Sequence, residues 1–143
     1  MTKAEIAELI PHAGAMCLLD GVLSWDATHI ACVASSHREA GNPLARDGRL
    51  DSVCGVEYAS QAMAVHGSLV GDGHPPAAGY LASLRDVVCM VERLDLLEDD
   101  LLVSAELLFA DGGRVMYQFC LTSSGAPVMS GRAAVLLDPG QPE

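Results

Sequence analysis

The segment from residue 52 to residue 70 (SVCGVEYASQAMAVHGSLV) limits the possible folds of this chain more than any other. Alanine and methionine dominate it, so the pattern predicts one long helix. Glu57 and His66 are its only side chains that can carry a charge near neutral pH. A helix that is apolar on nearly every side must be enclosed by other elements. We therefore expect the rest of the chain to wrap around it.

The remaining chain supplies the material for such an enclosure. Residues 3–9 place Ile6 and Leu9 at helical spacing, which predicts a short leading helix. Apolar runs separated by turn residues predict strands at 16–26, 29–37, 77–94, 101–111, 114–124 and 126–138, the third of them straight or kinked. This order predicts an α+β fold in which an antiparallel sheet is wrapped around the long central helix, the hotdog arrangement. We expect residues 1–143 to form a single hotdog domain.

The composition narrows the classes of function. Lysine and arginine number 8 against 19 aspartates and glutamates, a net charge of −11, which argues against nucleic-acid partners and against an anionic membrane surface. No stretch approaches the roughly 20 apolar residues of a membrane span, and the first residues lack a signal-peptide core, so we expect a cytoplasmic protein. Glycine-rich nucleotide motifs and a nucleophile elbow are absent. The sequence predicts no cofactor.

The cysteines do not form the pattern of a metal site or of a disulfide framework. They are five in number, widely spaced, and without a C-x-x-C pair: Cys17, Cys32, Cys54, Cys89 and Cys120. Their neighbours are mostly apolar, which is typical of buried thiols that act as small hydrophobic side chains. We therefore expect neither disulfides nor a metal site.

Glu57 is the most informative single residue. It lies in the first part of the predicted central helix, among apolar neighbours, where a buried carboxylate must be paired or hydrogen-bonded. Gln61 follows four residues later on the same helix face and can bind that carboxylate or a thioester. The alternative for Glu57 is a favourable interaction with the helix dipole at a position open to water. The alternative for Gln61 is ordinary surface polarity.

Five histidines are candidates for a partner base: His12, His29, His37, His66 and His74. His66 lies nine residues after Glu57, about 900° around the helix, and so on the opposite face. His37 ends the second predicted strand and opens the long loop 38–51, from which a side chain can reach a site. A structural or solvated role is the alternative for each histidine. His37 is the best candidate among them.

Several of these segments resemble the hotdog-fold 3-hydroxyacyl acyl-carrier-protein dehydratases. Residues 11–26 (PHAGAMCLLDGVLSWD) are similar to the opening of that family, and residues 79–94 look like its third strand. Residues 57–62 (EYASQA) match its central-helix pattern of an acidic residue, three others and a glutamine. The closest likeness is to the subgroup linked to aryl polyene pathways, in which a loop like 42–50 precedes a helix like 55–67. The resemblance covers nearly the whole chain.

The resemblance implies an activity and a site. It implies removal of water from 3-hydroxyacyl thioesters of acyl carrier protein or coenzyme A, giving trans-2-enoyl thioesters for fatty acid, polyketide or aryl polyene biosynthesis. Glu57 would act as the acid and Gln61 would orient it. The substrate-binding groups would be Gln61, Asn42 and the backbone at Val53, Cys54 and Gly55, where helix amides can polarise the thioester carbonyl.

The family's base is a histidine in a Gly-His-Phe-Pro loop, and aligning that loop on residues 42–44 places Gly48 at the histidine position. His37 can replace the base, a partner chain can supply it, or catalysis can have been lost, leaving a non-catalytic acyl-binding or partner subunit. Some hotdog thioesterases also carry a helix carboxylate and do not need this histidine. An acyl thioesterase is therefore the alternative enzyme.

The resemblance also implies partners. Hotdog pockets form between two subunits, so we expect a homodimer or a higher oligomer, with a heterodimer as a further option. Acyl carrier proteins are usually acidic, and Arg38, Arg46 and Arg49 on the long loop are the candidates for docking one. A solvated loop is the alternative for these arginines.

Overall fold

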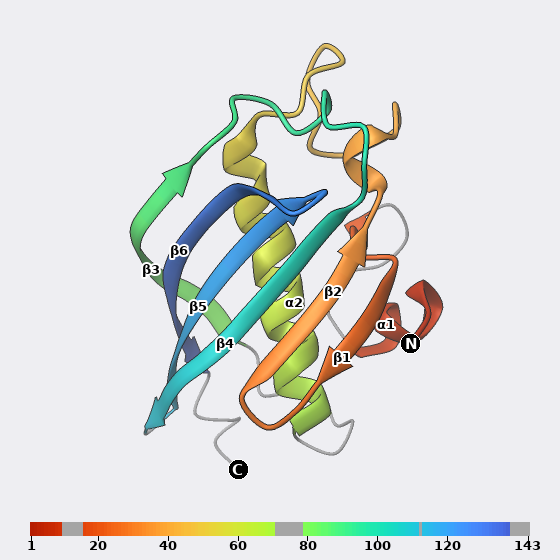
Figure 1. The fold of residues 1–143 in the computed structure, drawn as a ribbon. Coiled ribbons are helices and arrows are strands. Elements are labelled where there is room, and N and C mark those ends of the chain that lie inside the picture. Colours follow the sequence, from red (N-terminus) through yellow and green to blue (C-terminus); the bar gives the residue numbers. More distant parts are fainter. Residues whose placement is uncertain (10–15, 71–78, 112, 138–143) are drawn as a thin grey trace.

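The computed structural model describes residues 1–9, 16–70, 79–111 and 113–137 (Figure 1). His12, His74 and residues 77, 78 and 138 of the predicted strands lie outside this range. The helices are α1 (Lys3–Leu9) and α2 (Gly55–Val70), and two 3-10 turns are η2 (Ser36–Arg38) and η3 (Ser52–Cys54). The strands are β1 (Gly21–Trp25), β2 (His29–Ala34), β3 (Gly79–Cys89), β4 (Leu101–Asp111), β5 (Arg114–Ser123) and β6 (Ala126–Leu137).

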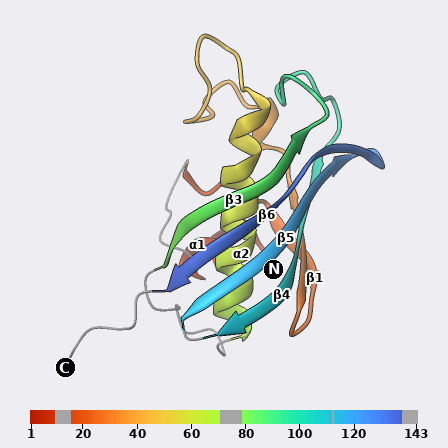
Figure 2. The same ribbon diagram turned by 90° about the vertical axis from the view of Figure 1, so that its left-hand side faces the viewer.

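The six strands form one antiparallel sheet in the order β1-β2-β4-β5-β6-β3. The sheet curves around α2, which crosses its concave side (Figures 1 and 2). Both the predicted order of elements and the α+β arrangement are confirmed. Strand β3 is irregular between Leu81 and Ser83 and again between Arg85 and Val88, so the third predicted strand is kinked.

Alternation along the central strands explains why one face of the sheet holds the helix. Leu101, Val103 and Ala105 of β4 are buried, whereas the residues between them are more exposed. In β5 the buried set includes Phe119 and Leu121. A strand with this period of two presents its apolar side chains to one face only. These rows form the core together with the buried residues of α2.

Three predicted strands are shorter than expected. The third ends at Cys89 rather than at residue 94, because the chain turns there and Ser52 and Leu50 of the segment before α2 pair with Glu92 and Leu94.

The shortening of the first two bears on the site. The first begins at Gly21 because the backbone at Met16 and Leu18 is hydrogen-bonded to the side chain of Gln61 on α2. The second ends at Ala34 because η2 follows almost at once. Residues that the sequence assigned to strands thus face the start of the central helix.

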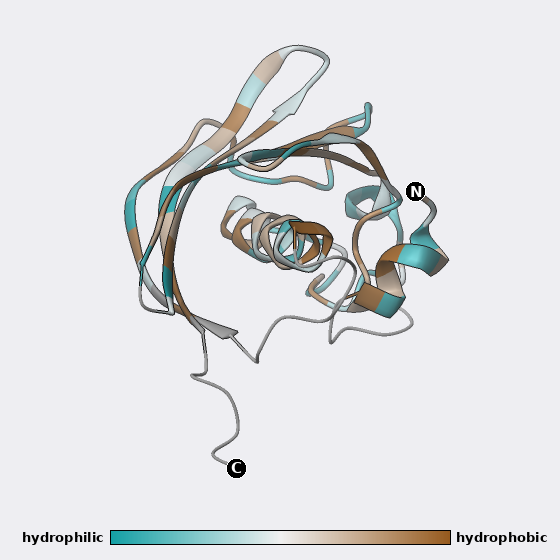
Figure 3. Cartoon of the chain, turned by 90° about the horizontal axis from the view of Figure 1, so that it is seen from below, coloured by the Kyte–Doolittle hydropathy of each residue, from teal (hydrophilic) through white to brown (hydrophobic). Residues whose placement is uncertain are grey.

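The helix is not enclosed on all sides, contrary to the expectation. Val53 is 63% exposed, and Val56, Glu57, Ser60 and Ala64 continue a partly exposed stripe along α2. One curved sheet covers only part of a helix circumference, and α1 lies beside it (Figure 3). The sequence shows that the helix is apolar, but it does not show whether this chain or another covers each side.

Candidate active site

The start of α2 is held by a short stretch of paired backbone. Ser52 donates its amide to the carbonyl of Glu92, and Leu94 donates to the carbonyl of Leu50. The amide of Leu50 donates in turn to the Asp95 carboxylate at 2.9 Å. A hydrogen bond from Arg93 is the main reason that the pKa of Asp95 falls to about 2. These contacts fix where the chain enters the helix.

The three backbone groups predicted to face a substrate differ in what they bind. The amide of Cys54 donates to the carbonyl of Asp51, and that of Gly55 donates to the carbonyls of Ser52 and Val53, so both are used by η3 and its caps. None of the hydrogen bonds among the described residues uses the amide of Val53. Asp51 occupies the cap position, but its carboxylate binds Arg49 rather than the helix amides. Val53 is 63% exposed as a residue, and its amide is therefore the best placed of the three to polarise a carbonyl.

Gly55 allows the helix to begin against the sheet. A Cβ at this position would lie 3.0 Å from Sδ of Met129 and 3.1 Å from Cδ2 of Leu121. Contacts this short are tighter than ordinary van der Waals packing, so a larger residue would push the first turn away from the sheet. The absence of a side chain at Gly55 thus lets the first turn, which carries Glu57, lie close to the sheet.

A hydrogen bond joins Glu57 and Gln61, which is one of the options that their spacing left open. Glu57 lies in the first turn of α2 and is partly buried, whereas Gln61 is fully buried. Nε2 of Gln61 donates to Oε1 of Glu57 at 3.4 Å. A carboxylate in the first turn of a helix is also stabilised by the helix dipole. The carboxyl group is thus held at the border between the core and the surface.

Gln61 is itself fixed in one orientation. Its Oε1 accepts from the amide of Leu18 at 2.8 Å, and its Nε2 donates to the carbonyl of Met16 at 2.7 Å. The donor amide at Leu18 requires an oxygen, so the nitrogen of Gln61 must face Met16 and Glu57. The side chain that binds Glu57 is therefore locked to the segment that precedes β1.

A second set of buried polar groups lies behind this pair, and sequence reasoning missed it. The Tyr58 hydroxyl is 2.9 Å from Oγ of Ser36 and accepts from Nδ2 of Asn42 at 3.1 Å. Burial raises the pKa of Tyr58, although both hydrogen bonds act in the opposite sense. A tyrosine in an otherwise apolar helix was the available signal, because a buried phenol nearly always finds a partner.

Asn42 has a structural position rather than an open one. It is 6% exposed, and both hydrogens of its amide are used, one by Tyr58 and one by the carbonyl of Ser36 at 2.9 Å. Its oxygen accepts from the amide of Leu44. No donor of this side chain is left for a substrate, which argues against the predicted substrate-binding role.

The structure does not bring His37 to Glu57. Consecutive residues of η2 point in different directions: Ser36 faces Tyr58, whereas the His37 ring is 1% exposed and bonds the carbonyl of Asp99 through Nε2 at 3.0 Å. Burial, reinforced by the charge of Arg38, lowers the pKa of His37. The contacts of this ring tie η2 to the segment before β4.

The three arginines proposed for docking are not equivalent. Arg38 donates to the carbonyl of Glu98 and to the Asp100 carboxylate, both at 2.7 Å. Arg49 is paired with Asp51. Arg46 is exposed and forms no ion pair with the described residues. Two of the three charges are thus balanced by nearby carboxylates.

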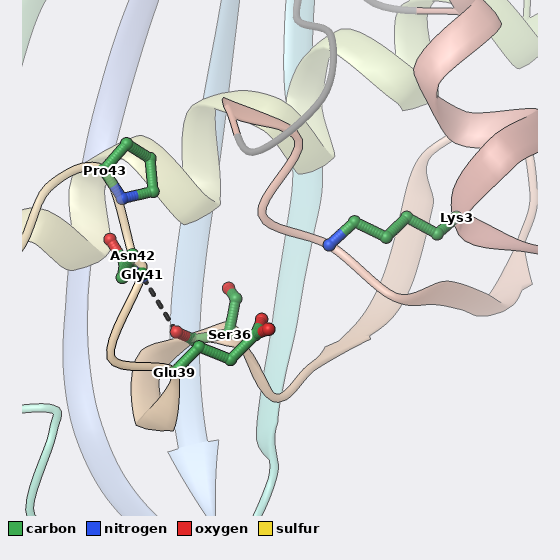
Figure 4. Close-up of a pocket in the computed structure, with 6 residues that line it drawn as sticks. All are labelled: Lys3, Ser36, Glu39, Gly41, Asn42 and Pro43. Atoms are coloured by element: carbon green, nitrogen blue, oxygen red, sulfur yellow. Dashed lines mark hydrogen bonds between the residues drawn. The ribbon is translucent and has the colours of Figure 1, made fainter.

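A small pocket includes Ser36 and Asn42, the two partners of Tyr58, in its lining (Figure 4). It measures about 120 Å³, and its lining is Lys3, Ser36, Glu39, Gly41, Asn42 and Pro43. Sites for small molecules usually measure roughly 300–1,000 Å³, so this pocket is too small for an acyl chain. Among the described residues no cluster of histidine, cysteine or acidic side chains could hold a metal ion, and no helix could cross a membrane.

His66 belongs to a separate cluster near the other end of α2. Its Nδ1 lies 2.7 Å from the Tyr117 hydroxyl and its Nε2 lies 2.9 Å from the carbonyl of Asp26. Burial raises the pKa of Tyr117 to about 12. The prediction that His66 does not share a site with Glu57 agrees with these contacts.

Comparison with known proteins identifies the family. A family model described as ApeP dehydratase matches residues 4–142. The chain belongs to the ApeP-like dehydratase family. The resemblance inferred from the EYASQA pattern and the preceding loop is confirmed. No curated protein is similar to the chain in sequence.

Solved structures show that members of this fold differ in activity. The chain is similar to one in "The Dehydratase Heterocomplex ApeI:P from Xenorhabdus doucetiae", with a TM-score of 0.80 and 21% identity over 93% of this chain and 90% of that chain. Zebra fish thioesterase superfamily member 2 has a TM-score of 0.67 and 16% identity over 96% and 99% of the two chains. AziG from S. sahachiroi has a TM-score of 0.66 and 11% identity over 90% and 97%. The ApeP-like chain therefore has the predicted hotdog fold.

Proposed function

We propose that this chain is the Glu57-bearing subunit of a dehydratase for 3-hydroxyacyl thioesters. The observation that carries the proposal is the carboxyl group of Glu57, partly buried in the first turn of α2 and bound by a glutamine that cannot rotate. Membership of a dehydratase family supports the reaction class. The acyl group is carried by an acyl carrier protein or by coenzyme A.

The reaction divides into two proton movements. A base removes the proton from C2 of the 3-hydroxyacyl thioester, and the thioester oxygen takes up the developing negative charge. We assign the stabilisation of that oxygen to the amide of Val53 in η3, just before α2, and the absence of a hydrogen bond from this amide among the described residues supports the assignment. Glu57 gives its proton to the hydroxyl group on C3, which leaves as water while the C2–C3 double bond forms. The base then releases the proton that it took from C2, and Glu57 takes up a proton from solvent, so that both groups return to their starting states for the next cycle.

The base in this proposal comes from a second subunit. The ring of His37 is buried against the backbone of Asp99, which does not suit a group that must reach a substrate. Among the described residues, the other histidines are His29 on β2 and His66 in its own cluster. A neighbouring hotdog chain that covers the exposed stripe of α2 could bring its own base to Glu57.

The surface for that second chain lies along α2 and β3. Strand β3 is the last in the sheet order, so no described strand pairs with its outer edge. Its side chains Leu81 and Leu84 are each 39% exposed, and Val88 is 52% exposed. An edge strand with apolar side chains is a natural site for pairing with another chain. The partner is a second copy or a different hotdog subunit, and the ApeI:P neighbour is a heterocomplex.

Carrier docking rests chiefly on Arg46 in this proposal, because Arg38 and Arg49 are already paired with carboxylates. Reversing the charge at Arg46 should raise KM for a carrier-bound substrate and leave KM for a coenzyme A thioester unchanged. Equal effects on both substrates would argue against carrier docking at this loop.

Mass spectrometry of a short 3-hydroxyacyl thioester tests the activity. The wild type, Glu57→Gln and His37→Ala are each measured alone and as the complex recovered with the natural partner. Loss of one water by wild type and by His37→Ala, but not by Glu57→Gln, supports the proposal. Loss of activity in a folded His37→Ala protein would assign the base to His37 instead. Release of a free acid would identify a thioesterase, and dehydration by Glu57→Gln would overturn the role of Glu57.

A further inference from the structure

The polar groups behind Glu57 form a continuous chain of hydrogen bonds, and we propose that Tyr58 and Ser36 are positioning residues that act through it on Glu57. The inference rests on the proposed dehydratase function. It concerns residues that contact neither the substrate nor the carboxyl group directly. Their effect passes through the segment 16–18 and Gln61.

These hydrogen bonds all donate in one direction, because each donor hydrogen has only one available acceptor. The hydroxyl hydrogen of Ser36 is donated to the carbonyl of Leu18 at 2.8 Å. Ser36 must therefore accept from Tyr58, whose hydroxyl in turn accepts from Asn42. The order of donation is Asn42 to Tyr58, Tyr58 to Ser36, and Ser36 to Leu18.

The same backbone segment connects this chain to the carboxyl group. Leu18 accepts from Ser36 through its carbonyl and donates through its amide to Oε1 of Gln61. Gln61 then donates to Glu57 from the nitrogen on its other side. If the hydroxyl of Ser36 no longer held Leu18, the amide of Leu18 would lose its fixed position opposite Gln61. The orientation of the donor toward Glu57 would then be less well defined.

Burial makes this arrangement rigid. Tyr58, Gln61 and Leu18 are fully buried, and Ser36 is 4% exposed. Few waters can replace a lost partner in such a place, so each group depends on the next one. The position of the catalytic carboxyl group matters because small displacements of a reacting group can change the rate about 10²-fold.

The protein contains a matched control near the other end of α2. Tyr117 is also a buried tyrosine whose hydroxyl bonds a side chain of α2, in this case His66. The hydrogen bonds of this second group run from Tyr117 to His66 and from His66 to the carbonyl of Asp26, near the opposite end of α2 from Gln61 and Glu57. Removing the hydroxyl of Tyr58 or that of Tyr117 should lower thermal stability, but only removal of the Tyr58 hydroxyl should change the active site.

The experiment compares Tyr58→Phe, Ser36→Ala and Tyr117→Phe with wild type, each in the complex that is active. Two properties are measured: kcat with KM for dehydration, and hydrogen exchange of the Gln61 side-chain amide by NMR. We expect Tyr58→Phe and Ser36→Ala to lower kcat about tenfold with KM unchanged and to speed the exchange. The double variant should lose no more than either single one, and Tyr117→Phe should change neither property.

The two readouts separate this inference from the proposed function. Unchanged exchange at Gln61 in both Tyr58→Phe and Ser36→Ala would overturn the positioning chain, whatever the enzyme activity. Equal effects of Tyr58→Phe and Tyr117→Phe on kcat would also overturn it, because general destabilisation would then explain the loss. Faster exchange in a protein that does not dehydrate any thioester would support the chain and overturn the proposed function.

Discussion

Helix α2 carries a buried polar cluster near each end, and the two clusters differ in the groups to which their hydrogen bonds lead. Near the start, Tyr58 and Gln61 bind groups from η2 and from the segment before β1, and the contacts lead to the partly buried Glu57. Near the end, His66 and Ser68 bind Tyr117 and backbone carbonyls, and both residues are buried. The end cluster holds the fold together, whereas the start cluster holds a titratable group near the surface.

The comparison shows that burial of polar residues does not by itself mark a site. Both clusters satisfy the rule that buried polar groups are hydrogen-bonded. What distinguishes the start of α2 is the first-turn carboxyl group of Glu57, close in sequence to the exposed residue Val53, where the helix dipole also favours negative charge. Function should therefore respond to changes at the start, and stability should respond more to changes at the end.

The largest expected difference concerns activity. Glu57→Gln should lower kcat for dehydration about 10²–10⁴-fold, because the amide cannot give a proton to the leaving hydroxyl. Its melting temperature should stay close to that of wild type, since the side chain keeps its shape. The matched change at the other end, His66→Phe, should leave kcat of the folded protein nearly unchanged. A large loss of kcat in His66→Phe at a temperature where it is folded would remove the contrast.

The next effect is on stability, and it falls at the end of the helix. His66→Phe leaves the Tyr117 hydroxyl buried without its partner, which should cost about 1–3 kcal/mol of unfolding free energy. Chemical denaturation of three variants measures this cost: His66→Phe, Tyr117→Phe and the double variant His66→Phe/Tyr117→Phe. The double variant should recover part of the loss, because it no longer contains an unpaired hydroxyl. Strictly additive losses would mean that the two side chains are not coupled.

Gly55→Ala tests whether the packing of the first turn of α2 against the sheet matters for activity as well as for stability. The new methyl group must displace Met129 or move the first turn, so we expect a loss of about 1–3 kcal/mol in unfolding free energy. Because the Glu57 turn would move with it, kcat should also fall. His66→Phe provides the control with a similar loss of stability and no loss of kcat. If Gly55→Ala keeps full activity, the depth of the first turn is not critical.

The sequence predicted the elements that a repeating pattern or a short spacing can reveal. The helix, the order of strands and the Glu57–Gln61 contact all follow from local periodicity. Tyr58 was missed because its partners Ser36 and Asn42 lie 22 and 16 residues away along the chain. Their meeting depends on the path of the loop after β2, which no periodicity encodes.

His37 and the arginines show the same limit at the scale of a single residue. The sequence placed His37 at the end of the second strand, but that strand ends at Ala34. The turn η2 that follows directs Ser36 toward the helix and His37 away from it. Arg38 and Arg46 are close in sequence, yet Arg38 binds the carboxylate of Asp100 from a distant segment. Side-chain direction within a short turn therefore decided which residue joined the site.

The smallest predicted effect is a pH dependence of stability at His37. The ring is buried and its pKa in the folded protein is lowered, whereas in the unfolded chain it takes up a proton near pH 6.5. As pH falls through that value the unfolded state binds the extra proton first, so unfolding free energy should decrease, by at most about 1.4 kcal/mol per pH unit. His37→Gln should therefore lose stability less steeply than wild type between pH 7 and pH 5, measured by denaturant unfolding at each pH.

His29→Gln is the control, because that side chain is only partly buried at the start of β2. A slope for His37→Gln equal to that of wild type would mean that the ring takes up its proton without leaving its place beside Asp99, and the claim that it is too enclosed to act as the base would lose its main support.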